Sequence, residues 1–248
     1  MSGQKASRLK FLWIATQTGL ITFYYCCRII FGSKFVRELR PFVDRMMRLW
    51  AEKLLKLIAV KINVTGQSNF PNDTSRPVIV MCNHSSLYDI PTSIVALNTS
   101  LRMLAKKELF KIPVFSAALR RGEFLSIDRH NREQSLKDLE VAKAKMLSGI
   151  ILWVAPEGTR SKDGKLAEFK KGGFHIALDT KALVIPLVIK NIHKVQAGSD
   201  LQLFLNQQID VEICQPIDAA EFNVETRREF VALVRERMLT ALQQNCAN

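Results

Sequence analysis

His84 and Asp89 lie five positions apart, directly after an apolar run of the sequence. On one continuous helix their side chains would be rotated by roughly 140° from each other, and on one strand they would lie on opposite faces. The two groups touch only if the chain turns between them. The carboxylate then accepts a hydrogen bond from one imidazole nitrogen and leaves the other nitrogen free as a base. An isolated pair at this spacing is more often a surface or capping feature, so the interpretation depends on the rest of the chain.

The segment that positions this pair is Val78–Cys82, a short, uncharged run rich in β-branched residues. These properties predict a buried strand. The apolar residues 90–97, which follow Asp89, are predicted to form a helix. His84 therefore follows the end of a strand, and loops at strand ends are where α/β proteins place their chemistry.

Two other predicted strands, at 124–127 and 150–154, also end in charged residues, and a helix is predicted to begin near residue 173 after two lysines. The charged residues in these positions are Asp128, Arg129, Glu157, Arg160, Lys170 and Lys171. Backbone N–H groups at a helix start, together with arginine and lysine side chains, form binding sites for anions. If the strands are neighbours in one sheet, its edge carries the histidine, the aspartate and an anion site together.

Several other kinds of site are excluded by their motifs. The sequence contains neither G-x-S-x-G nor G-x-G-x-x-G, so the α/β-hydrolase elbow and the dinucleotide fingerprint are absent. Gly158 and Gly164 are six positions apart, and Leu166 stands where a P-loop requires Ser or Thr. The four histidines do not cluster with cysteines at metal-ligand spacing, so no metal site is predicted. The five cysteines are odd in number and form no C-x-x-C, which indicates reduced thiols on the cytosolic side.

The alternation of predicted strands and helices indicates the α/β class, with a mixed, mostly parallel sheet flanked by helices. Residues 61–248 are predicted to form this domain, and residues 1–60 a separate membrane-associating helical segment. The segments 201–205 and 211–213 are predicted strands, with a hairpin as one option. Asn223 is predicted to cap the last helix.

The N-terminal segment combines apolar residues with basic charge. Residues 11–27 are uncharged, and the length of this segment is at the lower edge for crossing a bilayer, which needs about 20 residues. A short membrane span and a helix that lies within one leaflet are both left open. The pattern after Pro41 predicts an amphipathic basic helix, which either lies on the membrane or packs on the domain core. Residues 1–62 contain twelve Lys or Arg and three Asp or Glu, and the whole chain has a net charge of +13. Because the basic excess accompanies the apolar segment, we expect an anionic membrane surface as the partner and no nucleic acid.

Four motifs occur in order: N-H-S-S-L-Y-D at 83–89, I-D-R at 127–129, P-E-G-T-R-S at 156–161 and V-I-P-L at 184–187. Together they resemble the four blocks of the glycerolipid acyltransferase family, and most of all those of the bacterial 1-acylglycerol-3-phosphate (lysophosphatidate) acyltransferases. The resemblance extends over about residues 60–215. One departure is visible, because the third block of the family usually begins Phe-Pro-Glu-Gly and this chain has Ala155 in place of the aromatic residue. The catalytic groups are intact, and a change in packing near the acceptor pocket is expected.

The resemblance implies transfer of a fatty acyl group from acyl-CoA or acyl carrier protein to the sn-2 hydroxyl of 1-acyl-sn-glycerol 3-phosphate, which makes phosphatidic acid. His84 is then expected to take the proton from the acceptor hydroxyl while Asp89 orients the imidazole. No cofactor and no protein nucleophile are expected, because a thioester is already activated. The residues expected to bind substrate are Arg129, Glu157, Gly158, Thr159, Arg160, Lys170 and Lys171.

Within this set, Arg129 and Arg160 are expected to hold the acceptor phosphate, and Glu157 and Gly158 to shape that pocket by hydrogen bonds. The enzyme is expected at the cytoplasmic face of the inner membrane. One alternative is an acyltransferase with another acceptor, such as glycerol 3-phosphate, a lysophospholipid or an amino-acid lipid. The other is a membrane-surface binding protein without catalytic activity, against which the intact motif residues argue.

Overall fold

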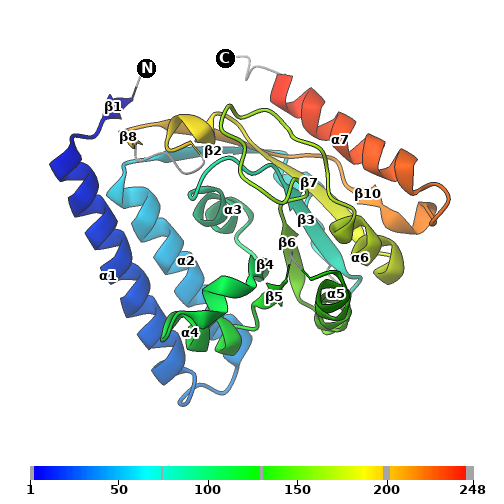
Figure 1. Cartoon of the computed structure of the whole chain (residues 1–248), viewed down its shortest axis with the longest axis horizontal. Coiled ribbons are helices and arrows are strands. Elements are labelled where there is room, and N and C mark those ends of the chain that lie inside the picture. Colours follow the sequence, from blue (N-terminus) through cyan, green and yellow to red (C-terminus); the bar gives the residue numbers. More distant parts are fainter. Residues whose placement is uncertain (1–2, 74, 129–130, 198–201, 244–248) are drawn as a thin grey trace.

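The computed structural model describes residues 3–73, 75–128, 131–197 and 202–243. Its sheet separates two layers of helices, and both ends of the chain lie on the same side of the molecule (Figure 1). The α-helices in this part of the chain are α1 (Arg8–Gly32), α2 (Leu39–Leu57), α3 (Asp89–Leu97), α4 (Phe115–Arg121), α5 (Arg132–Leu147), α6 (Gly172–Thr180) and α7 (Arg227–Gln243). The strands are β1 (Gln4–Lys5), β2 (Lys61–Thr65), β3 (Val78–Cys82), β4 (Leu101–Lys106), β5 (Leu125–Ile127), β6 (Ile151–Val154), β7 (Leu183–Ile189), β8 (Phe204–Leu205), β9 (Gln208–Ile213) and β10 (Ile217–Asp218).

Within the described residues, the main sheet has the order β2-β9-β7-β3-β6-β4-β5, and β10 pairs with β7 outside this path. The neighbours from β7 to β5 are parallel, whereas β9 runs antiparallel to β7 and parallel to β2. The predicted mixed, mostly parallel sheet is therefore confirmed. The hairpin option is wrong, because β8 pairs with β1 and β9 lies inside the main sheet. Alternate side chains of β9 are buried, which fits a place between β2 and β7.

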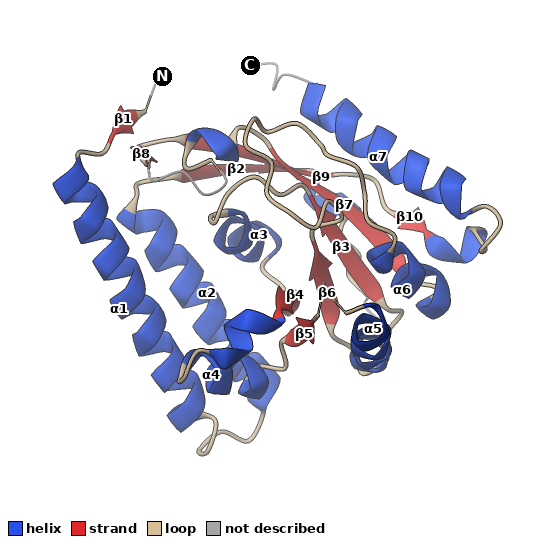
Figure 2. Ribbon diagram, viewed as in Figure 1, coloured by secondary structure: helices blue, strands red, loops and turns tan. Residues whose placement is uncertain are grey.

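The side chains of the central strands alternate between two hydrophobic cores. In β3, Val78, Val80 and Cys82 belong to the core that also contains buried residues of α1, α2 and α3. Ile79 and Met81 belong to the core under α5, α6 and α7. Both faces of the strand are covered by helices (Figure 2), which explains why its sequence is a continuous apolar run.

Helix α2 packs on α3 and α1 rather than standing apart from the sheet. It begins before Pro41, which a first helical turn accommodates because no intrahelical N–H bond is lost there. Its Asp44 Oδ1 accepts from the fully buried Arg102 of β4 at 2.7 Å. Its Arg40 Nε donates to Glu123, in the loop before β5, at 2.6 Å. Of the two options that the sequence left open for this helix, the structure shows packing on the core.

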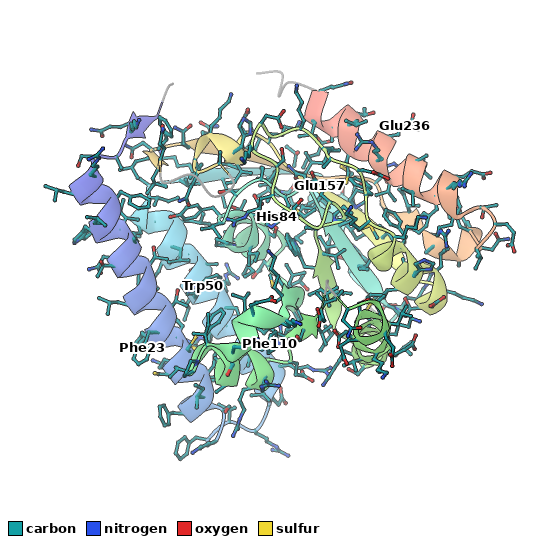
Figure 3. All side chains as sticks on the ribbon, in the orientation of Figure 1. Phe23, Trp50, His84, Phe110, Glu157 and Glu236 are labelled. Atoms are coloured by element: carbon teal, nitrogen blue, oxygen red, sulfur yellow. The ribbon has the colours of Figure 1, made fainter. Side chains whose placement is uncertain are left out.

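Helix α1 is apolar on two opposite sides. Ile14, Tyr25, Cys26 and Ile29 are buried. The large apolar side chains on the exposed side are Leu9, Leu12, Trp13, Leu20, Phe23, Tyr24 and Phe31. At about 100° per residue, these exposed residues lie within an arc of roughly 120°, and Phe23 points away from the body of the protein (Figure 3). We call this exposed set the α1 stripe. Among the described residues, no helix combines the length and the apolar character needed to cross a membrane.

Candidate active site

His84 and Asp89 are in contact, as the spacing predicts for a chain that turns between them. The imidazole Nδ1 lies 2.7 Å from Asp89 Oδ2. Because an ionised carboxylate only accepts hydrogen bonds, Nδ1 carries the proton and Nε2 is left as the free base. The Asp89 side chain is fully buried, whereas 20% of the His84 side chain is exposed. The pair therefore presents a base to solvent at the edge of the sheet where β3 ends.

Backbone N–H groups fix the turn between these two residues. Asp89 is the first residue of α3, where the positive end of the helix dipole favours a carboxylate. Its Oδ2 also accepts from the N–H of Ser85 at 2.8 Å and of Ser86 at 2.9 Å. Three donors converge on one oxygen, so the local chain itself places this carboxylate against the imidazole.

Two residues without a predicted role hold the turn against the sheet. Trp153 of β6 donates from Nε1 to Ser93 Oγ at 3.0 Å, and Ser93 Oγ donates to the Asp89 carbonyl at 2.8 Å. The Trp153 ring also meets the His84 ring edge-on, with 6.0 Å between centroids. The Asn83 amide exchanges two hydrogen bonds with the backbone of β7, at 2.8 and 3.0 Å. Asn83 could have been identified from its place beside the histidine, but a tryptophan inside an apolar strand carries no such signal.

The loop after β6 packs against the loop after β3, and Glu157 joins them. Its two carboxylate oxygens accept from the backbone N–H groups of His84 and Ala167, both at 2.8 Å. The side chain is buried, and this burial raises the pKa of Glu157 even though both N–H donors act in the opposite direction. Figure 3 shows Glu157 and His84 close together at this edge. Glu157 does not line either of the two cavities described below, and its hydrogen bonds go to the backbone of the loops beside them.

Two cavities open at this edge of the sheet and share a wall. The first, of about 400 Å³, is lined by His84 and Arg160 among others. The second, of about 460 Å³, lies on the α5–α6 side and is lined by Lys170 and the first residues of α6. Gly158 and Thr159 line both cavities. A group bound in the second cavity is therefore adjacent to the base in the first.

The predicted anion-binding residues are partly gathered at these cavities. Arg160 Nη1 is a buried atom with no hydrogen-bond partner in the described part of the chain, so it is a donor directed at no protein acceptor. Lys170 lines the second cavity, together with Lys106 at the end of β4, which had no predicted role. Lys171 is exposed at the N-cap of α6 and is not part of either lining. Arg129 lies outside the described residues.

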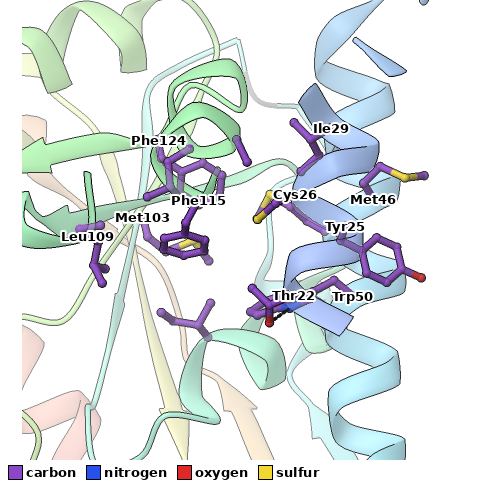
Figure 4. A pocket seen from close by; sticks show the side chains of 15 residues that line it. Thr22, Tyr25, Cys26, Ile29, Met46, Trp50, Met103, Leu109, Phe115 and Phe124 are labelled. Carbon is purple, nitrogen blue, oxygen red and sulfur yellow. Dashed lines mark hydrogen bonds between the residues drawn. The ribbon is translucent and has the colours of Figure 1, made fainter. Parts of the chain in front are cut away.

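A third, apolar cavity of about 130 Å³ adjoins the first and lies between α1 and α2 on one side and β4 and α4 on the other. Cys26 and Ile29 of α1 face Met103, Phe115 and Phe124 across it (Figure 4). The residues that it shares with the cavity of the base are Ile90, Met103, Ala105 and Leu109. The cavity that contains His84 thus shares residues with an apolar cavity and with a second cavity that is lined by two lysines.

Residues 61–190, just over half of the chain, match the family model described as Acyltransferase. The chain belongs to the acyltransferase family. The crystal structure of the 1-acyl-sn-glycerophosphate (LPA) acyltransferase PlsC from Thermotoga maritima matches this acyltransferase with a TM-score of 0.79 and 29% sequence identity, over 97% of this chain and 96% of that one. Among curated relatives, the chloroplastic 1-acyl-sn-glycerol-3-phosphate acyltransferase of Arabidopsis thaliana is 27% identical over 88% of this chain, and the alpha enzyme of Homo sapiens is 25% identical over 81%. This acyltransferase spans 62% of the Arabidopsis protein and 70% of the human one.

Proposed function

We propose that this acyltransferase moves a fatty acyl group from a thioester donor, acyl-CoA or acyl carrier protein, to the sn-2 hydroxyl of 1-acyl-sn-glycerol 3-phosphate. The product is phosphatidic acid. The observation that carries the proposal is the buried Asp89 held against His84, beside a cavity with basic groups on one side and an apolar cavity on the other. The names of the relatives in Thermotoga, Arabidopsis and human support the same acceptor.

In this reaction His84 Nε2 takes the proton of the acceptor hydroxyl as the hydroxyl oxygen attacks the thioester carbonyl carbon. Asp89 stabilises the imidazolium that forms, because it accepts from Nδ1. The tetrahedral intermediate then expels the thiolate, which takes the proton back from the imidazolium. A thioester needs no further activation, so no residue of the chain becomes acylated.

The second cavity is where we place the acceptor phosphate. Lys170 lines this cavity at the start of α6, where backbone N–H groups favour an anion. Arg160 lines the first cavity next to Thr159, which lines both, and its Nη1 has no hydrogen-bond partner among the described residues. Gly158 has a φ of +74°, a conformation that favours glycine, and it lets the backbone turn between the two cavities. Charge-assisted hydrogen bonds of this kind are worth about 1.5–3 kcal/mol each.

The apolar cavity is where we place the acyl chain of the donor. It opens from the side chains that surround the base, so a thioester carbonyl near His84 directs its hydrocarbon toward α1 and α2. Its wall includes Ile29 and Trp50, and Trp50 is held by a hydrogen bond from its Nε1 to Thr22 Oγ1 at 3.1 Å. The length of this cavity would limit the acyl chains that the enzyme accepts.

The α1 stripe supports binding to an anionic membrane surface. Three basic residues lie beside its aromatic rings: Lys10 at 5.9 Å from Trp13, Arg28 at 5.8 Å from Tyr24, and Lys34 at 5.9 Å from Phe31. Aromatic rings next to cations suit the headgroup region of a bilayer that contains anionic lipids. Because both the acceptor and the product are lipids, an enzyme on that surface meets its substrate directly.

One experiment tests this function. Purified full-length protein is incubated with acyl-CoA or acyl carrier protein and with a panel of acceptors: 1-acyl-sn-glycerol 3-phosphate, glycerol 3-phosphate, lysophosphatidylcholine and an amino-acid lyso-lipid. The lipid products are identified by mass spectrometry, with His84→Ala as the inactive control. We expect phosphatidic acid from the first acceptor and little product from the others. A preference for another acceptor, or turnover by His84→Ala equal to that of the wild type, contradicts the proposal.

A further inference from the structure

The backbone of the proposed base is held on both sides by one segment of the chain. The N–H of His84 donates to Glu157 Oε1 at 2.8 Å. The carbonyl of His84 accepts from the N–H of Ser161 at 2.7 Å. Both backbone polar groups of His84 are therefore satisfied by residues 157–161, which lie 73 and more positions further along the chain.

Glu157 makes its half of this contact with a carboxylate whose two oxygens each accept from a backbone N–H. Its second oxygen accepts from the N–H of Ala167 at 2.8 Å, and the residue is only 2% exposed. Two backbone donors offset the cost of burying the charge. The carboxylate thus connects the loop after β3 to both ends of the loop that follows β6.

The two residues that follow Gly158 face the cavity, in contrast to Glu157. At Gly158 the positive φ reverses the chain, and Thr159 and Arg160 then line the cavity that contains the base. A Cβ at position 158 would approach Lys170 Cγ to 3.2 Å. Within residues 157–160, the Glu157 carboxylate thus binds backbone N–H groups, whereas Arg160 lines the cavity that contains His84.

We propose that Glu157 is a positioning residue for the base: it sets where His84 stands relative to Arg160, and it does not bind the substrate. This inference rests on the proposed function for the role of the base. Its consequence is that the loss of Glu157 slows the chemical step and leaves acceptor binding intact. A displacement of about 1 Å in a catalytic group costs on the order of 10²-fold in rate.

Glu157→Gln is the test variant, because it keeps the size of the side chain and leaves one oxygen as acceptor. Its NH₂ group faces a backbone N–H, so one of the two bonds becomes a contact between donors. We expect kcat to fall about 10²-fold and the KM for the acceptor to stay within about twofold. Arg160→Ala is the matched comparison, and it should raise the acceptor KM with a smaller effect on kcat. Glu157→Asp, which retains the charge but reaches only one donor, should repeat the fall in kcat and serves if the glutamine variant does not fold.

A direct readout of position accompanies the kinetics. The chain has four histidines, so the ring signals of His84 can be assigned by NMR on histidine-labelled protein with His84→Ala as reference. In Glu157→Gln we expect shifted His84 signals and faster hydrogen exchange at the His84 and Ala167 amides, while exchange in α7 is unchanged. A general loss of stability would instead speed exchange everywhere.

The proposal is overturned if Glu157→Gln raises the acceptor KM with kcat unchanged, or if the His84 signals stay in place. These outcomes differ from a failure of the proposed function. The wild-type acceptor panel decides the function, and the Glu157 kinetics can be measured with whichever acceptor that panel shows to be used.

Discussion

Replacing Asp89 by asparagine isolates the charge that stabilises the protonated base. The variant keeps the size of the side chain, and an amide oxygen can still accept from His84 Nδ1 and from the N–H groups of Ser85 and Ser86. Only the charge opposite the imidazolium is lost. The fully buried position of Asp89 means that solvent does not replace that charge.

The size of the effect follows from the geometry of the pair. With 2.7 Å between Nδ1 and Oδ2, the two charges are centred about 4 Å apart in the transition state, where an effective dielectric constant of about 20 gives roughly 4 kcal/mol. At about 1.4 kcal/mol for each factor of ten, kcat should fall about 10³-fold. The acceptor KM should change little, because Asp89 does not line either cavity at this edge.

The assay is the rate of phosphatidic acid formation from mixed micelles of acceptor and detergent, measured by mass spectrometry at saturating donor. Asp163→Asn is the control, since the hydrogen bonds and the ion pair of this exposed aspartate in the described part of the chain stay within its own turn, to Ser161 and Lys165. Thermal unfolding of both variants should lie near that of the wild type. Asp89→Asn with more than a third of the wild-type kcat would refute the role of the dyad.

Further tests address the ligand pockets, the membrane and pH. Arg160→Ala should raise the acceptor KM about 10- to 100-fold, the value of one or two charge-assisted hydrogen bonds, and an unchanged KM removes it from the phosphate site. Ile29→Phe should shorten the preferred acyl chain in a mixture of acyl-CoAs, and an unchanged product distribution would place the chain elsewhere. Phe23→Ser should reduce flotation with anionic liposomes more than Leu136→Ser, an equally exposed apolar residue on α5, and equal losses would argue against the α1 stripe. The hydrogen bond from Arg40 lowers the pKa of Glu123 to about 2, and Lys145 contributes in the same direction. The ionised Glu123 therefore stabilises the fold above about pH 4.5, and this stabilisation is lost as the pH falls toward 2. Glu123→Gln should therefore lower the free energy of unfolding by about 1–2 kcal/mol at pH 7 and by progressively less as the pH falls through about 2. A difference independent of pH would contradict this linkage.

The sequence permits a correct prediction of the α/β class because each element carries its own pattern. β3 is a continuous apolar run that only a strand covered on both faces explains, and α2 has apolar residues at helical spacing. The contact between His84 and Asp89 also follows from local chemistry, since the N–H groups that orient the carboxylate lie within four residues of it. Local signals of this kind do not extend to β8 and β9, whose partners depend on strands far away in the chain.

Glu157 shows which part of a site a motif leaves open. Its place in P-E-G-T-R-S predicts a role at the phosphate, and the neighbouring Thr159 and Arg160 do line the cavity. Whether a side chain faces a ligand or the protein depends on the backbone at that residue. Here Glu157 accepts from two backbone N–H groups, whereas Thr159 and Arg160, which follow the positive φ of Gly158, line the cavity. Trp153 was missed for a related reason, because its indole acts through Ser93, a residue 60 positions away.

The sequence by itself thus determined the class of fold and the contact between His84 and Asp89, since periodicity and local hydrogen bonding are properties of neighbouring residues. Tertiary structure alone decided which residues surround the base. The apolar cavity requires α1 to lie opposite Phe115, and the basic cavity requires β4 and α6 to meet. Those arrangements depend on how helices pack on two faces of a sheet, which is a property of the whole buried surface and not of any one segment.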